Sequence, residues 1–391
     1  MCLRAVDDDI TQETAGAPYS IVAEAPWRTR MTRTTPPRPV DVEAVLPALS
    51  AHRRTATRLH PRHGVAKAEE NSLAGPLLWP ADEPWPVCTA VHPKGTGHRL
   101  DDVRLKRRIL AEARGRDFSD EERRTLDAIA PGRHAPDLRD EDPLPLLAVA
   151  QLYARDIPDL VGPEGHDLLQ VFWCPFEAHG PDRTIDVVLK WRRSHEVGDV
   201  LPNQPEPPVA GREACVPTRC VLHPEQVVEH EYQGLLSEEL QDALADREEG
   251  LLDEEEDDED TDDSSEPRSY DTYEEYEAAM ARARAEEEYE VTYMGDLSIA
   301  PGWKVGGFAS WHLTDPSPVD CAVCATPMPP LLTVDKWECD GGSGSWLPLE
   351  DRDSTDDPDV IDPVGVHLGR GLMRIHTCPT DPKHPHRLSF Q

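Results

Sequence analysis

Two cysteines in the C-terminal part of the chain, Cys321 and Cys324, have the Cys-x-x-Cys spacing that places two thiolates on one metal ion from a tight turn. Near the end of the chain, a further cysteine is followed by two histidines in a proline-rich turn. Three thiolates and one imidazole form a closed tetrahedral set, which is typical of structural zinc. The spacing therefore predicts one structural zinc ion per chain. Its expected ligands are Cys321, Cys324, Cys378 and His384, with His386 as an alternative to His384.

The alternative interpretation is that these are ordinary loop cysteines without a metal. The first half of the chain offers a weaker set of donors, Cys88, His92, His98 and Cys174. We favour the interpretation that Cys88 and Cys174 are small buried apolar groups beside tryptophans. The segment Cys220-Val-Leu-His223 also has ligand-like spacing, but the apolar residues between its two donors favour a strand.

Catalytic sequence motifs are absent: the chain has no nucleophile elbow, phosphate-binding loop, dinucleotide fingerprint or zinc-protease helix. Asp335, Glu338 and Asp340 form a cluster of carboxylates beside a glycine pair, and such a cluster could serve acid–base chemistry in a hydrolase. We favour the alternative that these acids end a strand and face solvent, as most acidic side chains do. The sequence thus favours a protein that is not an enzyme and assigns it no catalytic residue.

The composition indicates a soluble, strongly acidic protein. The chain has 391 residues, a net charge of −36 and a mean hydropathy of −0.59. Between residues 246 and 290, 22 acidic residues stand against four arginines, which accounts for half of the excess charge. Such a charge repels phosphate backbones and argues against nucleic-acid binding. No run approaches the ~20 apolar residues that span a membrane. The first residues also lack the apolar core of a signal peptide, so we expect a cytoplasmic location with reduced cysteines.

The order of short motifs is the same in the two ends of the chain. Each end has a glycine turn with a tryptophan, then a cysteine, then an apolar strand after a proline, then an apolar strand followed by Cys-Pro. A repeated order of this kind predicts an internal duplication. In the first half the segments are Ser72-Leu-Ala-Gly-Pro-Leu-Leu-Trp79, Cys88, Pro145-Leu-Leu-Ala-Val-Ala-Gln151 and Leu169-Gln-Val-Phe-Trp-Cys174. In the second half they are Lys304-Val-Gly-Gly-Phe-Ala-Ser-Trp311, Cys321, Pro330-Leu-Leu-Thr-Val and Leu372-Met-Arg-Ile-His-Thr-Cys378.

The elements that would position these motifs are mainly strands, so we predict an α+β fold of mixed, mostly antiparallel sheets. Strands are expected at 144–152, 168–172, 184–191, 331–337 and 371–377, and in the segment 220–230. Helices are expected from Asp41, in two short pieces within 100–130 that include a Ser119/Glu122 capping box, at 237–247, and at 270–290.

We therefore divide the chain into four parts by composition and motif. Residues 1–40 are a disordered extension, in which Met31 is an alternative start to Met1. Residues 41–235 are the first repeat unit with a helical insertion, and 236–300 are a helix and a disordered acidic insertion. Residues 301–391 are the second repeat unit with the zinc site.

Five tryptophans flanked by glycine or proline admit two interpretations. They could line a binding groove between the repeats, or they could supply the hydrophobic mass of a small core, which we favour. These residues are Trp79, Trp85, Trp311, Trp337 and Trp346.

Together the motifs Ser72-x-x-Gly-Pro-x-x-Trp79-Pro, Leu-Leu-x-x-x-Gln151-Leu, Leu169-Gln-Val-Phe-Trp-Cys, Lys304-Val-Gly-Gly and Leu331-Leu-Thr-Val resemble the YwqG-like family of bacterial proteins. The resemblance covers roughly residues 60–390 outside the acidic segment. It implies a duplicated α+β fold, no established activity and no catalytic residues. It also supports a joint role for Cys321, Cys324, Cys378 and His384. The chain departs from short family members in its helical and acidic insertions.

Three functional hypotheses follow. The first is a non-enzymatic binding or regulatory protein with a structural zinc, in one version an immunity-type protein that neutralises a basic protein partner. The second is a hydrolase that uses a metal or the carboxylates. The third is an acidic mimic of a nucleic acid. The partner, the substrate and the oligomeric state are not encoded in any motif of the sequence.

Overall fold

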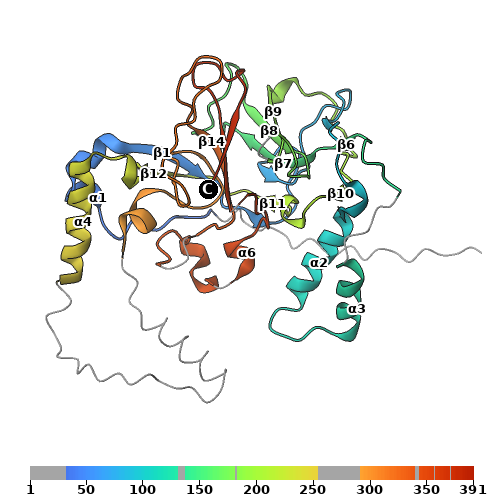
Figure 1. Cartoon of the computed structure of the whole chain (residues 1–391), viewed down its shortest axis with the longest axis horizontal. Helices are drawn as coiled ribbons and strands as arrows, with labels where there is room; N and C mark the ends of the chain where they lie inside the picture. Colours follow the sequence, from blue (N-terminus) through green and yellow to red (C-terminus); the bar gives the residue numbers. More distant parts are fainter. Residues whose placement is uncertain are drawn as a thin grey trace, which may run out of the picture. The chain divides into compact units, whose positions relative to one another are not determined.

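Two six-stranded antiparallel sheets organise the fold (Figure 1). The computed structural model describes residues 32–130, 137–180, 183–253, 291–339, 343–355, 357–369 and 371–391. The expected N-terminal extension up to residue 31, the helix at 270–290 and nearly all of the acidic insertion lie outside these residues. The α+β class is confirmed, because helices are segregated from sheets that are antiparallel throughout.

The first sheet, which we call the N-sheet, is built around the motifs of the first half. Its strands in spatial order are β2 (Arg62–His63), β11 (Cys220–Val221), β3 (Ser72–Leu73), β7 (Leu147–Tyr153), β8 (Leu168–Trp173) and β9 (Val187–Arg192). Every residue of β8 is buried, which explains why this strand, apart from Gln170, is apolar without alternation. The glutamine side chains of the two central strands, Gln151 and Gln170, hydrogen-bond to each other at 2.9 Å.

The second sheet, the C-sheet, carries the motifs of the second half. Its strands in spatial order are β12 (Glu225–His230), β1 (Arg53–Arg58), β13 (Lys304–Gly306), β14 (Pro330–Asp335), β15 (Leu372–His376) and β16 (Arg387–Phe390). The edge strand β16 was not predicted, because it is short and follows a proline-rich turn. Two small two-stranded sheets pair β4 (Val87–Cys88) with β6 (Leu144–Pro145) and β5 (His98–Arg99) with β10 (Val209–Ala210).

The two sheets share an antiparallel meander of four strands. The run β3-β7-β8-β9 is an antiparallel meander, and so is the run β13-β14-β15-β16. The first repeat unit also supplies two strands to the C-sheet: β1 pairs with β13 on one side and with β12 on the other. These pairings tie the two repeat units together through backbone hydrogen bonds.

Apolar side chains from both sheets form one common core. The cluster joins Val149 and Val171 of the N-sheet to Leu332, Val334 and Met373 of the C-sheet. A second cluster is formed by residues of the first half. In it the rings of Trp79, Trp85 and Phe172 contact one another, with centroids 5.2–5.3 Å apart. Trp79, Trp85 and Trp346 are therefore core residues, as favoured, whereas Trp337 keeps 47% of its surface exposed.

One short helix precedes the first strand, and the other helices lie in the connections between strands. The bounds are α1 (Val42–Val45), α2 (Leu100–Glu112), α3 (Asp120–Ile129), α4 (Glu238–Asp253) and α6 (Pro358–Ile361), with a π-helical turn at Tyr293–Ser298. Asp41 caps α1 as predicted, and Ser119 and Glu122 form the predicted capping box at the start of α3. Among the described residues, no helix combines the length and the apolar character that crossing a membrane requires.

Candidate metal centres

The structure brings together the four residues expected to share an ion in the second half. The Sγ atom of Cys321 lies 3.4 Å from Nδ1 of His384, and the Sγ atoms of Cys324 and Cys378 lie 3.5 Å apart. One donor atom from each of the four lies within 4.8 Å of every other. We call these residues the second-half donor group. It contains His384 and not the alternative ligand, His386.

A tight turn between β13 and β14 positions the first two cysteines. The amide of Val323 donates to the Sγ atom of Cys321 at 3.4 Å, and the amide of Ala325 donates to the carbonyl oxygen of Cys321 at 2.9 Å. Ala325 has a φ of 55°, the left-handed conformation that reverses the chain here. This turn places the thiol groups of Cys321 and Cys324 on the same side.

The other two donors flank the turn that joins β15 to β16. Cys378 follows the last residue of β15 by two positions. The amide of His384 donates to the carbonyl oxygen of Asp381 at 3.0 Å, and the amide of Lys383 donates to a carboxylate oxygen of Asp381 at 2.9 Å. An ion held by all four residues would therefore fasten the loop before β14 to the turn that leads into the edge strand.

The second-half donor group reaches the protein surface at Cys324, which is accessible to solvent. A hydrogen bond with the side chain of Thr326 is the main cause that lowers the pKa of the Cys324 thiol to about 6. A hydrogen bond with Cys378 raises the pKa of His384. Burial raises the pKa of Cys321. The surroundings of Cys324 thus favour a thiolate, which is the form that binds metals.

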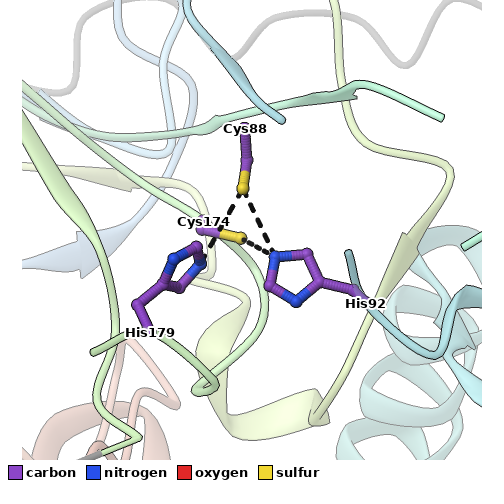
Figure 2. Close-up of side chains that lie close together, drawn as sticks. All are labelled: Cys88, His92, Cys174 and His179. Carbon is purple, nitrogen blue, oxygen red and sulfur yellow. Dashed lines mark hydrogen bonds between the residues drawn. The ribbon is translucent and has the colours of Figure 1, made fainter. Parts of the chain in front are cut away.

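A second group of donors lies in the first half (Figure 2). The Sγ atoms of Cys88 and Cys174 each lie 3.3 Å from Nε2 of His92, and the Sγ atom of Cys88 lies 3.8 Å from Nε2 of His179. The four side chains point toward one another, and one donor atom of each lies within 4.8 Å of every other. We call these residues the first-half donor group. Three of them are buried, and His179 is partly buried.

Two connections bring the first-half donors together: the loop that follows β4 and the segment between β8 and β9. Cys88 ends β4, and its Sγ atom accepts a hydrogen bond from the amide of Ala90 at 3.4 Å. His92 follows in the same loop. Cys174 comes directly after β8, and His179 begins a hairpin in which it exchanges two backbone hydrogen bonds of 2.9 Å with Thr184. The β-structure on both sides therefore fixes the backbone next to three of the four donors.

Burial governs the electrostatics of the first-half donor group. It lowers the pKa of His92 to about 4 and raises the pKa of the Cys174 thiol. The ring of His92 stacks on that of Phe176, with centroids 4.7 Å apart and an angle of 6° between the planes. A neutral imidazole keeps a lone pair on one nitrogen, and this lone pair is what a metal ion binds.

The structure corrects one donor of the weaker set predicted for the first half. His98 lies in β5, where its Nδ1 atom is 3.5 Å from a carboxylate oxygen of Glu213, and it is not part of the group. His179 takes its place. The signal that could have identified it is spacing, since His179 follows Cys174 by five residues and His384 follows Cys378 by six.

Cys220 and the acidic cluster belong to neither group. Cys220 lies buried in β11, as the strand interpretation predicted, and its Sγ atom is 3.6 Å from the carbonyl oxygen of Pro363. The expectation that Asp335 and Glu338 face solvent is wrong. Glu338 is 3% exposed and accepts the amide of Trp303 at 2.9 Å, and Asp335 is partly buried. Asp340 lies outside the described residues.

Within the described residues, two groups of cysteine and histidine side chains could therefore each hold a metal ion. Each group offers four donors and mixes thiolate with imidazole, a combination that suits ions of soft or borderline character. The chain matches no model of a known protein family, and no curated protein matches its sequence.

Proposed function

We propose that this chain is a non-enzymatic binding protein whose second half is fastened by a structural zinc ion and whose ligand is a small organic anion. The zinc part of the proposal rests on the second-half donor group. Zinc–sulfur bonds of about 2.3 Å and zinc–nitrogen bonds of about 2.0 Å give a tetrahedron with edges of roughly 3.3–3.8 Å. The separation of 3.4 Å between Cys321 and His384 and that of 3.5 Å between Cys324 and Cys378 fall in this range.

The ligand count supports a structural role for this zinc. Four protein donors fill a tetrahedral ion, so no coordination position is left for a water molecule or a substrate. The ion would act by holding the loop of Cys321 and Cys324 against the turn before β16, and so by fixing the edge of the C-sheet.

The binding part of the proposal rests on a cavity of about 450 Å³ above the outer face of the C-sheet. Neighbouring strands contribute a row of polar side chains to it, since Lys304 lies opposite Thr333, and Thr333 lies opposite Arg374. The remaining wall is largely apolar. It includes Met294, Leu313, Trp337 and Leu372.

The environment of Arg374 indicates that the ligand is an anion. One terminal nitrogen of its guanidinium donates to Oγ of Ser310 at 2.7 Å, whereas its Nε atom and the Oγ1 atom of Thr333 have no hydrogen-bond partner among the described residues. Burial lowers the pKa of Arg374 to about 10, which leaves it a cation at neutral pH. Lys304, in contrast, is already paired with Glu229. A buried guanidinium with donor capacity to spare suits a carboxylate, and the apolar wall suits an aliphatic or aromatic body.

The test is thermal denaturation of the full chain in a panel of aliphatic and aromatic carboxylates. At least one acid is expected to raise the melting temperature of the wild type in a concentration-dependent way and to have no effect on Arg374→Gln. Lys336→Gln is the matched control, because Lys336 also lines the cavity but stacks on Trp337. An equal response of the wild type and Arg374→Gln would contradict the proposed site.

The charge distribution favours a second candidate function, the capture of a basic protein. Half of the net charge of −36 lies between residues 246 and 290. An acidic segment of this kind accelerates association with a basic partner and makes it sensitive to salt. The test is to compare the wild type with a chain lacking 246–290 in a binding assay with one purified basic protein at ~0.15 M salt. Equal affinity of the two chains would remove this candidate.

A further inference from the structure

We propose that the first-half donor group is a second metal centre, which binds one zinc ion inside the first half, so that the full chain binds two. This inference uses Cys88, His92, Cys174 and His179, and its test is separate from that of the ion proposed above. Four separate observations support it: the topology, the local hydrogen bonding, the interatomic distances and the balance of charge.

The topology gives each donor an equivalent in the other half. In both meanders two donors lie between the first and second strands, one follows the third strand, and one precedes the fourth strand. In the first half these are Cys88 and His92, then Cys174, then His179. In the second half they are Cys321 and Cys324, then Cys378, then His384. A duplicated unit that carried one metal site would place donors at these same points in both copies.

The local structure around the first cysteine of each group is also repeated. The amide of Ala90 donates to the Sγ atom of Cys88 at 3.4 Å, and the amide of Val323 donates to the Sγ atom of Cys321 at 3.4 Å. In both cases the donor lies two residues after the cysteine. Such a hydrogen bond stabilises a thiolate and directs its remaining lone pairs toward the other donors.

The distances fit a tetrahedral ion better than they fit a hydrogen-bonded cluster. The separations of 3.3, 3.3 and 3.8 Å between sulfur and Nε2 atoms agree with tetrahedral edges of roughly 3.3–3.8 Å. Without an ion, Nε2 of His92 could form only one strong hydrogen bond, although it lies 3.3 Å from both sulfurs. With an ion, each side chain supplies one donor and each donor is used once.

The charge balance suits the depth of each site. Two thiolates and two neutral imidazoles cancel the charge of a divalent ion, so the first-half centre would be neutral. Three thiolates and one imidazole leave one negative charge at the second-half centre. Burying a net charge is costly, and the neutral set is the more deeply buried of the two: Cys174 and His92 are 0% and 1% exposed, whereas Cys324 is accessible to solvent.

A metal ion here would fasten two connections of the first half to each other. It would join the loop after β4 to the end of β8 and to the hairpin that leads into β9 (Figure 2). These loops border the cluster of Trp79, Trp85 and Phe172, and the same cluster includes Cys88, Cys174 and Phe176. The second ion would thus support the core of the first half as the first supports the edge of the C-sheet.

The experiment is metal counting on the full-length chain by elemental analysis, together with titration of the metal-free chain with Co²⁺. The wild type is expected to contain two zinc ions and to bind two Co²⁺ ions with the absorption of tetrahedral thiolate sites. Cys88→Ser/Cys174→Ser and Cys321→Ser/Cys378→Ser are each expected to keep one ion, and the combination of all four substitutions none. Cys215→Ser, which changes a fully buried cysteine outside both groups, is expected to keep two.

The outcomes separate the two sites. One ion in the wild type that is lost only from Cys321→Ser/Cys378→Ser would overturn the second centre and leave the proposed function intact. One ion that is lost only from Cys88→Ser/Cys174→Ser would do the reverse. Should Cys88→Ser/Cys174→Ser fail to fold, His179→Ala serves instead, because this ligand lies in a partly buried hairpin. Competition with a chromophoric chelator measures the affinity of His179→Ala for its two zinc ions. One of the two affinities is expected to fall at least tenfold. If both affinities are unchanged, the proposal is overturned.

Discussion

Lys304 and Glu229 form an ion pair in which neither side chain keeps more than 2% of its surface exposed. The carboxylate of Glu229 also accepts the amides of Ala300 at 3.0 Å and Phe308 at 2.9 Å. The Lys304-Val-Gly-Gly motif therefore wraps around a glutamate that lies on β12, 75 residues earlier in the chain. This pair joins β12, a strand of the first repeat unit, to the repeat motif of the second half.

We predict that Lys304→Met lowers the free energy of unfolding by about 3–5 kcal/mol, because it leaves a buried carboxylate without its counter-ion. Urea denaturation at neutral pH measures the change. Lys304→Met/Glu229→Gln is expected to recover part of the loss. Arg104→Met is the control: it breaks an ion pair with Glu206 in which both partners are more than a third exposed, and it should cost less than about 1 kcal/mol. Equal effects of Lys304→Met and Arg104→Met would contradict the prediction.

Gly307 illustrates why the second glycine of this motif is needed. Its φ is +73°, and a Cβ atom at this position would lie 2.2 Å from Oε2 of Glu229. We predict that Gly307→Ala destabilises the protein by more than 2 kcal/mol, since Glu229 is held by Lys304 and cannot move away. Gly115→Ala is the matched control, because Gly115 has a φ of +72° with open space around it, so only the backbone strain of about 1 kcal/mol remains. Urea denaturation measures both variants. If the two lose the same amount of unfolding free energy, the contact with Glu229 is unimportant.

The sequence was sufficient to predict the central strands and the second-half donor group, because both depend on local patterns. The apolar runs at Leu168–Trp173 and Pro330–Asp335 indicate buried strands without knowledge of their neighbours. A Cys-x-x-Cys turn is likewise recognisable without the other two ligands. The pairing of β11 with β3 could not be predicted, since β11 has only two residues and its place beside β3 depends on the rest of the fold. His179 was missed because it carries no motif of its own, and the spacing from Cys174 that relates it to His384 is too short a signal to stand out before the fold is known.

The burial of Glu338 could not be predicted either, because an acidic residue after a strand normally faces solvent. Its Oε1 atom accepts the amide of Trp303 at 2.9 Å, and its carbonyl oxygen accepts a hydrogen bond from Arg58 at 2.7 Å. These contacts come from parts of the chain that are distant in sequence. Long-range packing, and not local preference, therefore determines the charge environment of this residue.

The two donor groups differ in solvent exposure, so we expect them to lose metal at different rates. A mercurial thiol reagent in the presence of a chromophoric zinc chelator should release one ion quickly, through the accessible thiol of Cys324, and the second slowly. Cys324→Ser should remove the fast phase and leave the slow phase unchanged. A single phase that releases both ions in the wild type would contradict the assignment of one exposed and one buried centre.

The pH dependence of stability should reveal the buried Glu338. Burial raises the pKa of this carboxyl to about 7 in the folded protein, against 4.5 for an ordinary glutamate. Between these two values the folded state binds more protons than the unfolded state, so this residue makes stability fall as the pH rises from about 5 to about 8. Glu338→Gln cannot lose a proton, and its amide oxygen can still accept the amide of Trp303.

We predict that the wild type loses about 2–3 kcal/mol more unfolding free energy than Glu338→Gln when the pH is raised from 5 to 8. Urea denaturation at both pH values measures this shift, and Glu112→Gln, at an exposed helical position, should show almost none. A difference that stayed constant with pH would mean that Glu338 ionises in the folded protein as it does in the unfolded chain.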